Sequence, residues 1–345
     1  MVLIESYPVA VTMCIITMLC WGSWANTQKL ASREWKFQLF YWDYAIGVLL
    51  LTLILAFTMG SMGMGEGGRS FIADLKQASG KMILYAFIGG VIFNFANILL
   101  VAAIDIAGMA VAFPVGIGIA LVQGVVINYI GTPEGNPFVL FTGVALVAVA
   151  IVIDAIAYKR LQSGSAERQG ILKGLVLSVV AGVTMGLFYR FVAKSMVPDF
   201  TAPGAFINPL NAGALTPYSA LVVFALGLLL SCAVFVTVIM FKPFSGERVS
   251  PSDYFNKGTP RLHLIGIVGG AIWSLGMSFS IIASGAAGPA ISYGLGQGAT
   301  MIAAFWGVYI WKEFKDAPQG TSKMLNAMFG CFIIGLALII AARVI

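Results

Sequence analysis

The sequence has few charged residues for its length. Only 10% of its 345 residues are charged, whereas 59% are hydrophobic. A soluble globular domain carries about 25% charged residues, so this chain could not cover its surface against water. Lipid is then the main solvent, and the chain is expected to lie in a membrane.

The sequence also lacks the residue sets of metal sites, disulfide frameworks and signal peptides. Cys14, Cys20, Cys232 and Cys331 lie in apolar runs and form no Cys-x-x-Cys pair, which is typical of small apolar residues in helices. His263, the single histidine, cannot hold a metal alone. We therefore predict no metal and no cofactor. The first eight residues hold no Lys or Arg, unlike a signal peptide, so the first apolar run is expected to be retained.

What the sequence does contain is a series of apolar runs of about 20 residues, the length that spans a bilayer as a helix. The runs are continuous, whereas barrel strands alternate apolar and polar residues. We therefore predict an all-α membrane protein with ten transmembrane helices. Their expected bounds are 9–30, 37–59, 82–103, 109–130, 138–158, 171–196, 216–241, 262–284, 289–311 and 324–342.

Lys and Arg are distributed unevenly between the connections. One side carries Lys29, Arg33, Lys36, Lys159, Arg160, Arg168, Lys173, Lys242, Arg248, Lys257, Arg261, Lys312, Lys315 and Lys323, and the other Arg69, Lys76, Lys81, Lys194 and Arg343. The positive-inside rule assigns the richer side to the cytoplasm. The predicted topology has both termini outside, in an inner or plasma membrane. This orientation explains the net charge of +6 without a nucleic-acid partner.

An internal repeat relates residues 89–130 to residues 180 positions later. Gly89-Gly90 meets Gly269-Gly270, Phe93 meets Trp273, and Tyr129-Ile130 meets Tyr309-Ile310. Five spans in each half would turn the second half upside down, as in many secondary transporters. We predict a first repeat over 1–158, a cytoplasmic linker over 159–170 and a second repeat over 171–345.

Glycine and proline interrupt two spans at matched places. The expected helix breaks involve Pro114, Gly116, Gly118, Gly294, Gly296 and Gly298. Such breaks mark the binding site of inverted-repeat transporters, although close helix packing would also use these glycines. The loop Gly63-Met64-Gly65-Glu66-Gly67-Gly68 fits a nucleotide-loop spacing, but it lacks the strand and helix that such a site needs.

Polar residues within the spans are the candidate site. Asp43 is predicted to couple proton and solute movement, since an ionisable group in hydrocarbon is costly, although a helix dipole could also stabilise it. Arg190 is a candidate gate, unless its long side chain only reaches to the interface. Candidates for substrate contact are the amides Asn94, Asn97, Gln123 and Gln297 and the rings of Trp21 and Trp273. Neighbouring helices could instead satisfy the amides, and Trp21 could be an interface anchor.

Short motifs in nearly every part of the chain resemble the drug/metabolite transporter superfamily, and within it the ureide permease and glucose/rhamnose-uptake branches. They are Trp21-Gly22-Ser23-Trp24, Tyr41-Trp42-Asp43-Tyr44, Gly89-Gly90 with Asn97, Ala107-Gly108-Met109-Ala110-Val111, Ile127-Asn128-Tyr129, Phe305-Trp306-Gly307 and Glu313-Phe314. The resemblance implies a ten-helix carrier that imports small polar metabolites, usually with protons. The chain lacks the long central segment of plant ureide permeases, which favours a bacterial relative. It also lacks the span-1 glutamate of small multidrug exporters.

We therefore predict a secondary transporter and not an enzyme. It is expected to import a neutral polar solute, with a sugar favoured, by alternating access and symport with a proton or Na⁺. A ureide or nucleobase permease and an exporter of the same superfamily are the alternatives. A membrane enzyme, a scaffold or a channel is more remote, because the acids are scattered and the repeat favours a carrier.

Overall fold

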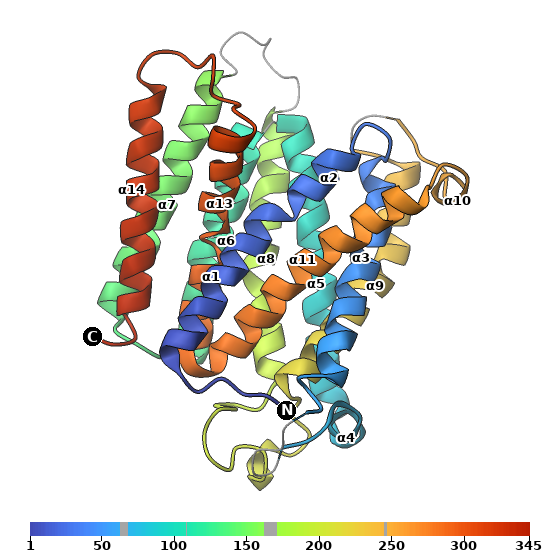
Figure 1. Ribbon diagram of the computed structural model, residues 1–345, viewed down its shortest axis with the longest axis vertical. Coiled ribbons are helices and arrows are strands. Elements are labelled where there is room, and N and C mark those ends of the chain that lie inside the picture. Colours follow the sequence, from blue (N-terminus) through green and yellow to red (C-terminus); the bar gives the residue numbers. More distant parts are fainter. Residues whose placement is uncertain (63–67, 108, 162–170, 245–246) are drawn as a thin grey trace.

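The computed structural model describes residues 1–62, 68–107, 109–161, 171–244 and 247–345, which form a bundle of helices (Figure 1). Within these residues no strand is assigned, and Met196 and Leu215 form an isolated β-bridge. The prediction of an all-helical membrane protein is confirmed. The nucleotide-loop spacing at 63–67 and the linker residues 162–170 lie outside the described residues.

The elements are α1 (Tyr7–Ser23), α2 (Ala25–Ala31), α3 (Phe37–Phe57), α4 (Phe71–Gln77), α5 (Gly80–Ala107), α6 (Met109–Gly131), α7 (Pro137–Leu161), α8 (Ile171–Ser195), η1 (Pro209–Asn211), α9 (Pro217–Phe241), α10 (Asp253–Asn256), α11 (Pro260–Ala287), α12 (Pro289–Gly296), α13 (Ala299–Phe305), η2 (Trp306–Ile310) and α14 (Thr321–Ala341).

Nine helical segments of the described chain are long and apolar enough to cross a membrane. They are Tyr7–Ala31, Phe37–Phe57, Gly80–Ile104, Pro114–Gly131, Pro137–Leu161, Leu172–Ser195, Pro217–Phe241, Pro260–Ala287 and Thr321–Ala341. Each corresponds to one of the ten predicted spans. The predicted span 289–311 is instead divided into α12, α13 and η2. Large apolar side chains on the outside of the bundle, such as Phe138 at 81% exposure and Leu172 at 74%, fit a lipid environment.

The division of the 289–310 segment follows from its glycines. α12 ends at Gly296, and α13 begins after Gly298. Glycine is a poor helix former because it loses the most backbone entropy on folding. The following η2 is a π-helix, a rare form that is frequent at functional sites. By contrast, Pro114 lies inside α6, which continues through it.

Two long helices begin at sequence signals that are independent of the bilayer. Thr216 caps α9 and accepts a hydrogen bond from the Ser219 amide, and Pro217 is the first helical residue. Thr259 caps α11 in the same way, followed by Pro260. A threonine cap satisfies an otherwise unpaired amide, and proline has none to lose. Both starts therefore fix where the α8–α9 and α10–α11 connections end.

The helices pack as two groups and a peripheral pair. In one group α8 packs on α5 and α6, and α9 on α5. In the other, α11 packs on α1, α3 and α12, and α13 lies on α1. The two groups also meet each other, α9 on α3 and α12 on α6. The peripheral pair is α7 and α14, at one side of the bundle in Figure 1. Both chain termini lie at the end of the bundle that also holds α4, opposite to α2 and α10 (Figure 1).

Candidate functional site

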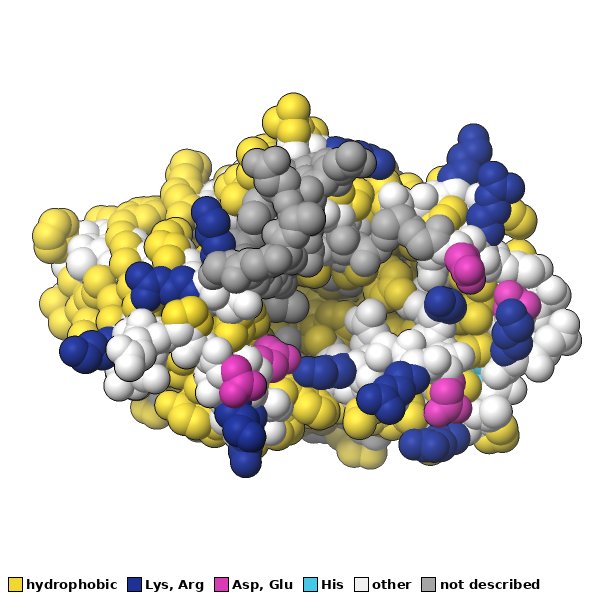
Figure 2. Space-filling view, turned by 90° about the horizontal axis from the view of Figure 1, so that it is seen from above, with side chains coloured by type: hydrophobic (Ala, Val, Ile, Leu, Met, Phe, Trp, Pro, Cys, Tyr) yellow, Lys and Arg dark blue, Asp and Glu magenta, His cyan; other side chains and the backbone are white. Residues whose placement is uncertain are grey.

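A pocket of about 440 Å³ opens between α2, α3, α5 and α9. Its volume falls in the range of small-molecule sites, roughly 300–1,000 Å³. The walls are mostly apolar, and the polar side chains come from the ends of the helices. The lining residues are Gln28, Lys36, Phe37, Gln38, Ile98, Val101, Ala102, Ile104, Ile239, Pro243, Phe244 and Glu247. The pocket therefore lies at the end of the bundle that holds α2 and α10. Figure 2 shows this end, with Lys and Arg side chains spread over it and a hollow near its centre.

A buried polar pair lies one helical turn from the pocket wall. Phe37 lines the pocket and packs on Tyr41, with 5.2 Å between ring centroids. The Asn97 side-chain amide, 7% exposed, donates to the Tyr41 hydroxyl at 3.0 Å. Ile98, the residue after Asn97, lines the same pocket. Of the predicted amide contacts, Asn97 is therefore the one that adjoins a residue lining this pocket.

Asn94 lies deeper and is fully buried. Its amide nitrogen donates to the Leu228 carbonyl oxygen at 3.2 Å and to the Ser231 hydroxyl at 2.7 Å. The carbonyl partner fixes the orientation of the amide, because a carbonyl can only accept. The Asn94 Oδ1 atom is left without a hydrogen-bond partner in the structure. The two asparagines thus contact different helices, Asn94 on α9 and Asn97 on α3, and Asn94 keeps a free acceptor in the interior.

Trp273 lies at the centre of a buried aromatic cluster. Its ring is 4.4 Å from that of Phe93, 6.2 Å from Tyr44 and 6.1 Å from Phe224, measured between centroids. Trp21 stacks on it at 5.9 Å, and the Trp21 indole nitrogen donates to the Trp273 carbonyl oxygen at 3.2 Å. The structure therefore brings both predicted tryptophans together. The Tyr44 hydroxyl in this cluster has no hydrogen-bond partner in the structure.

Asp43 is held by three side chains from outside its own helix. Its carboxylate is 1% exposed and accepts from the Trp35 indole nitrogen at 3.1 Å and from the Tyr254 hydroxyl. The His263 Nδ1 atom lies 2.9 Å from Asp43 Oδ1, the distance of an ion pair if the ring is protonated. Burial and the nearby Asp43 carboxylate raise the pKa of Tyr254, so this phenol stays a hydrogen-bond donor. Asp43 thereby connects α3 with α10 and α11 near the pocket end.

The remaining predicted contacts lie apart from the pocket. Gln123 on α6 donates to the Val183 carbonyl oxygen of α8 at 2.9 Å. Gln297, 8% exposed, lies at the break between α12 and α13. Arg190 lies at the opposite end of the bundle, where its guanidinium donates to the Gly131 carbonyl oxygen at 3.3 Å and to the Thr132 hydroxyl at 3.5 Å.

The predicted helix-break glycines mostly adjoin protein side chains. A Cβ atom added to Gly296 would lie 2.8 Å from the Trp21 ring, and one on Gly298 would lie 2.9 Å from Leu336. Cβ atoms on Gly116 and Gly294 would similarly meet a leucine and a valine. By contrast, a Cβ on Gly118 would meet nothing within 4 Å. In this conformation four of these glycines permit close packing.

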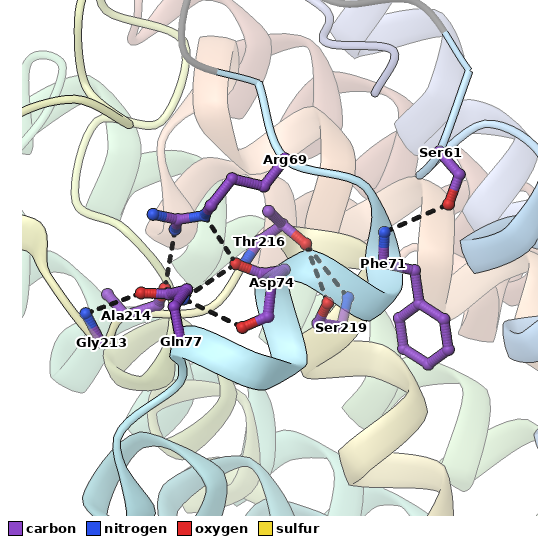
Figure 3. Close-up of polar contacts among 9 residues, drawn as sticks. All are labelled: Ser61, Arg69, Phe71, Asp74, Gln77, Gly213, Ala214, Thr216 and Ser219. Carbon is purple, nitrogen blue, oxygen red and sulfur yellow. Dashed lines mark hydrogen bonds and ion pairs between the residues drawn. The ribbon is translucent and has the colours of Figure 1, made fainter.

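A second buried carboxylate lies at the opposite end of the bundle (Figure 3). Asp74 on α4 is 0% exposed and accepts from Arg69 Nε at 3.0 Å, from the Gln77 amide at 3.0 Å and from the Thr216 backbone amide at 2.8 Å. Arg69 and Gln77 also each donate to the Ala214 carbonyl oxygen at 3.0 Å. This network ties α4 to the start of α9, where a negative charge is stabilised by the helix dipole.

Sequence reasoning did not assign the partners of the predicted residues. The sequence presents Tyr41, which accepts from Asn97, only as part of a motif, and His263 only as a histidine that cannot hold a metal alone. It gives no indication of Tyr254, which donates to Asp43. Tyr254 is 211 positions from Asp43. Among these, the isolated histidine in a span rich in glycine was the one usable signal.

Comparisons with known proteins agree with this architecture. The sequence profile of the family described as Ureide permease matches residues 40–169 and 161–342. Ureide permease 1 of Arabidopsis thaliana is 22% identical over 394 residues, which cover 99% of both chains. The L-rhamnose-proton symporter of Cronobacter sakazakii is 29% identical over 190 residues, 52% of each chain. A solved crystal structure with 15% identity has a TM-score of 0.59 over 96% of both chains, so it shares the fold.

These relatives are transporters, by name permeases and symporters, and the profile match extends over most of the sequence. The expectation that the chain resembles the ureide permease and rhamnose-uptake branch is confirmed. The chain belongs to the ureide permease family, and it is a multi-pass membrane transporter rather than an enzyme.

Proposed function

We propose that the chain is a ten-span carrier of two inverted repeats that imports a small neutral polar solute together with a proton. In this proposal α12, α13 and η2 together form the ninth span, broken at Gln297. The position of both termini at one end of the bundle supports it, because an even number of crossings returns the chain to the same side (Figure 1). Repeats would cover 1–158 and 171–345, joined by the linker 159–170.

The crossing of α5 over α9 and that of α11 over α3 support the repeat. A Cβ atom added to Gly90 would lie 2.0 Å from the Phe224 carbonyl oxygen. A Cβ added to Gly270 would lie 1.9 Å from the Tyr44 carbonyl oxygen. Gly270 and Gly90 are 180 positions apart, and so are Phe224 and Tyr44. The same offset thus relates both partners of the two crossings.

The reciprocal contacts follow the same rule. A Cβ on Gly227 would lie 2.1 Å from the Phe87 carbonyl oxygen, and one on Gly47 would lie 2.1 Å from that of Ile267. Gly227 and Gly47 are 180 positions apart, and so are Ile267 and Phe87. This spacing is the observation that carries the proposal, because chance matches in glycine-rich sequence would not also reproduce the contacts.

The hydrogen bonds at the crossings repeat as well. Asn94 donates to the Leu228 carbonyl oxygen, and Ser274 donates to that of Val48 at 3.1 Å. Phe93 and Trp273, one residue earlier on each helix, are in contact with each other. A pseudo-twofold axis in the membrane plane would pass between these two rings. Substrate sites in such folds lie near the midplane at the repeat interface.

The proposed topology has both termini outside the cell and the pocket open to the cytoplasm. The Lys- and Arg-rich connections support it, and they gather at the pocket end (Figure 2). The solute would enter or leave by this pocket and contact Asn97, Asn94 and Trp273 deeper in the bundle. Gln123, Gln297 and Trp21 remain proposed contacts at the repeat interface.

Sugars and ureides are both supported as solutes. Curated relatives include ureide permeases and L-rhamnose-proton symporters. Aromatic rings beside amide groups suit a sugar face and a flat ureide alike. A proton is favoured over Na⁺ as coupling ion, because a relative is a proton symporter and because Asp43 is a buried carboxylate. Asp43 is the proposed coupling residue.

An uptake panel tests the proposed function. Cells of a transport-deficient host expressing the protein are expected to accumulate one compound among labelled hexoses, rhamnose, allantoin and uracil. Accumulation should fall to the level of the empty host when a protonophore removes the proton gradient. Accumulation that depends on Na⁺ instead would contradict the choice of ion, and uptake of none of the four classes would contradict import of this solute type.

Asn97→Ala is expected to raise the concentration for half-maximal uptake by roughly tenfold, with less effect on the maximal rate. A lost hydrogen bond to a solute and to Tyr41 accounts for about 0.5–1.5 kcal/mol or slightly more. Concentration-dependent uptake in membrane vesicles measures the change. Asn128→Ala is the control, because Asn128 is also a buried amide but donates to the Gly124 carbonyl oxygen of its own helix. Equal effects of both substitutions would argue against a solute contact.

A further inference from the structure

A buried hydrogen bond joins α8 to α11 at the end of the bundle away from the pocket. The Tyr189 hydroxyl donates to the Ser280 carbonyl oxygen at 3.1 Å and lies 3.2 Å from the Ser280 hydroxyl. Both side chains are 0% exposed. This contact crosses between the two packing groups, since α8 belongs with α5 and α6, and α11 with α1 and α3.

The bond continues into a chain of polar contacts. The Ser292 hydroxyl of α12 donates to the Ser280 carbonyl oxygen at 2.6 Å and lies 3.2 Å from the Ser280 hydroxyl. The Cys14 thiol of α1 lies 3.5 Å from the Ser292 hydroxyl. Four helices therefore meet at one buried point, with the Tyr189 ring packed on that of Tyr293 at 5.2 Å. Buried networks of this kind are stable only while all members stay paired.

At the opposite end of the bundle no hydrogen bond joins α1 or α2 to α5 among the described residues, and the Asn97–Tyr41 bond there joins α5 to α3 instead. There the pocket separates the groups, with Gln28 of α2 on one side and Ile98 and Val101 of α5 on the other. Under the proposed repeat, the contact of α1 and α2 with α5 is the counterpart of the contact of α8 with α11. Two repeats of one architecture thus hold different conformations, tethered at one end and apart at the other.

We infer that Tyr189 is the gating residue at the end that holds the chain termini. Its hydroxyl keeps the two groups together in the conformation whose pocket opens at the other end, and the bond must break when access alternates. This inference rests on the proposed carrier function. In inverted-repeat transporters one repeat or bundle rocks or gates against the other during the cycle, so a bond between α8 and α11 that has no counterpart between α1 and α5 in the described chain belongs to one access state.

Tyr189 fits this role better than its neighbour Arg190. The Arg190 guanidinium contacts Gly131 and Thr132 at the end of α6. Since α6 and α8 pack in the same group, those contacts need not change when the groups separate. The bond from Tyr189 to Ser280 joins the two groups, so it has to break when they separate.

The native Cys14 thiol reports whether this gate opens. It is 0% exposed and contacts the tethered Ser292. In a protein where Cys20, Cys232 and Cys331 are replaced by serine, Y189F is expected to speed the reaction of Cys14 with a membrane-impermeant maleimide by about three- to tenfold, the effect of losing one net hydrogen bond. The rise should occur when the reagent is applied on the side that holds the termini. Right-side-out and inside-out vesicles separate the two sides.

Tyr218→Phe is the matched control. Tyr218 is 1% exposed and its hydroxyl donates to the Val2 carbonyl oxygen at 2.9 Å, near the same end but within a different contact. In Y218F the rate at which Cys14 reacts with the maleimide should equal that of the parent. All variants should keep the thermal stability of the parent in detergent. An unchanged rate in Y189F, an equal rise in Y218F, or a rise only from the pocket side would each overturn the inference. Because labelling needs no solute, it can succeed even if the uptake panel fails.

Discussion

Alanine at Gly270 or at Gly90 is expected to remove most of the folded protein from the membrane. The added Cβ would lie 1.9 Å from the Tyr44 carbonyl oxygen in the first case and 2.0 Å from that of Phe224 in the second. Real Cβ atoms do not approach oxygen so closely, and the obstacle is backbone rather than a side chain that could turn aside. The crossing helices would have to separate by about 1 Å, which breaks the packing on both sides of the contact. We expect a loss of 3 kcal/mol or more, at the upper end of overpacking effects.

The loss is measured as the amount of monodisperse protein after extraction and as the thermal midpoint of what remains. Gly330→Ala is the control, because a Cβ at this helical position in α14 would meet nothing within 4 Å. Alanine is the better helix former there by about 0.8–1 kcal/mol, so stability should hold or rise. Normal yield and midpoint for both crossing substitutions would mean that the two helix pairs are looser than the structure indicates, and the symmetric crossings would then lose their weight as support for the repeat.

Nine of the predicted spans could be found from the sequence because lipid imposes a simple rule. A helix must keep about 20 apolar residues in the bilayer, and the runs are long enough to satisfy it without further information. The sequence predicts helix breaks at Gly294, Gly296 and Gly298, and the 289–310 segment is divided there, whereas α6 continues through Pro114. Glycine can either pack or break a helix. Which outcome applies depends on neighbours such as Leu336, and those lie outside the local sequence.

The candidate site was less accessible to sequence reasoning. The polarity rule identifies Asp43, Asn94 and Asn97 as costly in hydrocarbon, but it does not give their partners. Asn94 and Asn97 are three residues apart, a spacing that places both on one side of a helix, yet they contact α9 and α3 respectively. A helix face spans about 100°, and at a crossing of three helices this angle is wide enough to reach two of them.

The repeat was visible in the sequence through its glycines, and the contacts explain why those positions match. Gly90 and Gly270 each sit against a carbonyl oxygen of the crossing helix, so no other residue fits at either one. At these two positions the spacing of 180 residues is therefore explained by backbone that meets backbone.

Asp43→Asn is expected to abolish accumulation against a gradient while leaving exchange of solute across the membrane. Asparagine keeps the size, but Trp35 and Tyr254 donate to different carboxylate oxygens, so its single amide oxygen can accept from only one of them. It also removes the charge that lies beside His263. If Asp43 carries the coupling proton, the variant behaves as a permanently neutral carboxyl, and the proton gradient can no longer drive uptake. Net accumulation should fall by at least tenfold.

Two measurements on proteoliposomes separate coupling from folding. Uptake driven by an imposed pH gradient should vanish in Asp43→Asn, while counterflow of labelled solute against an internal excess of unlabelled solute should continue at a rate within a few fold of the parent. Asp253→Asn is the control, since Asp253 adjoins Tyr254 but its carboxylate is 21% exposed and paired with Lys257 at the surface.

If Asp43→Asn loses counterflow as well as driven uptake, at unchanged protein yield, the carboxylate has a structural role in holding α3 to α10 and α11, and the coupling proton binds elsewhere. If driven uptake survives, Asp43 is not the coupling residue, because a group that cannot change charge cannot link the movement of a proton to that of a solute.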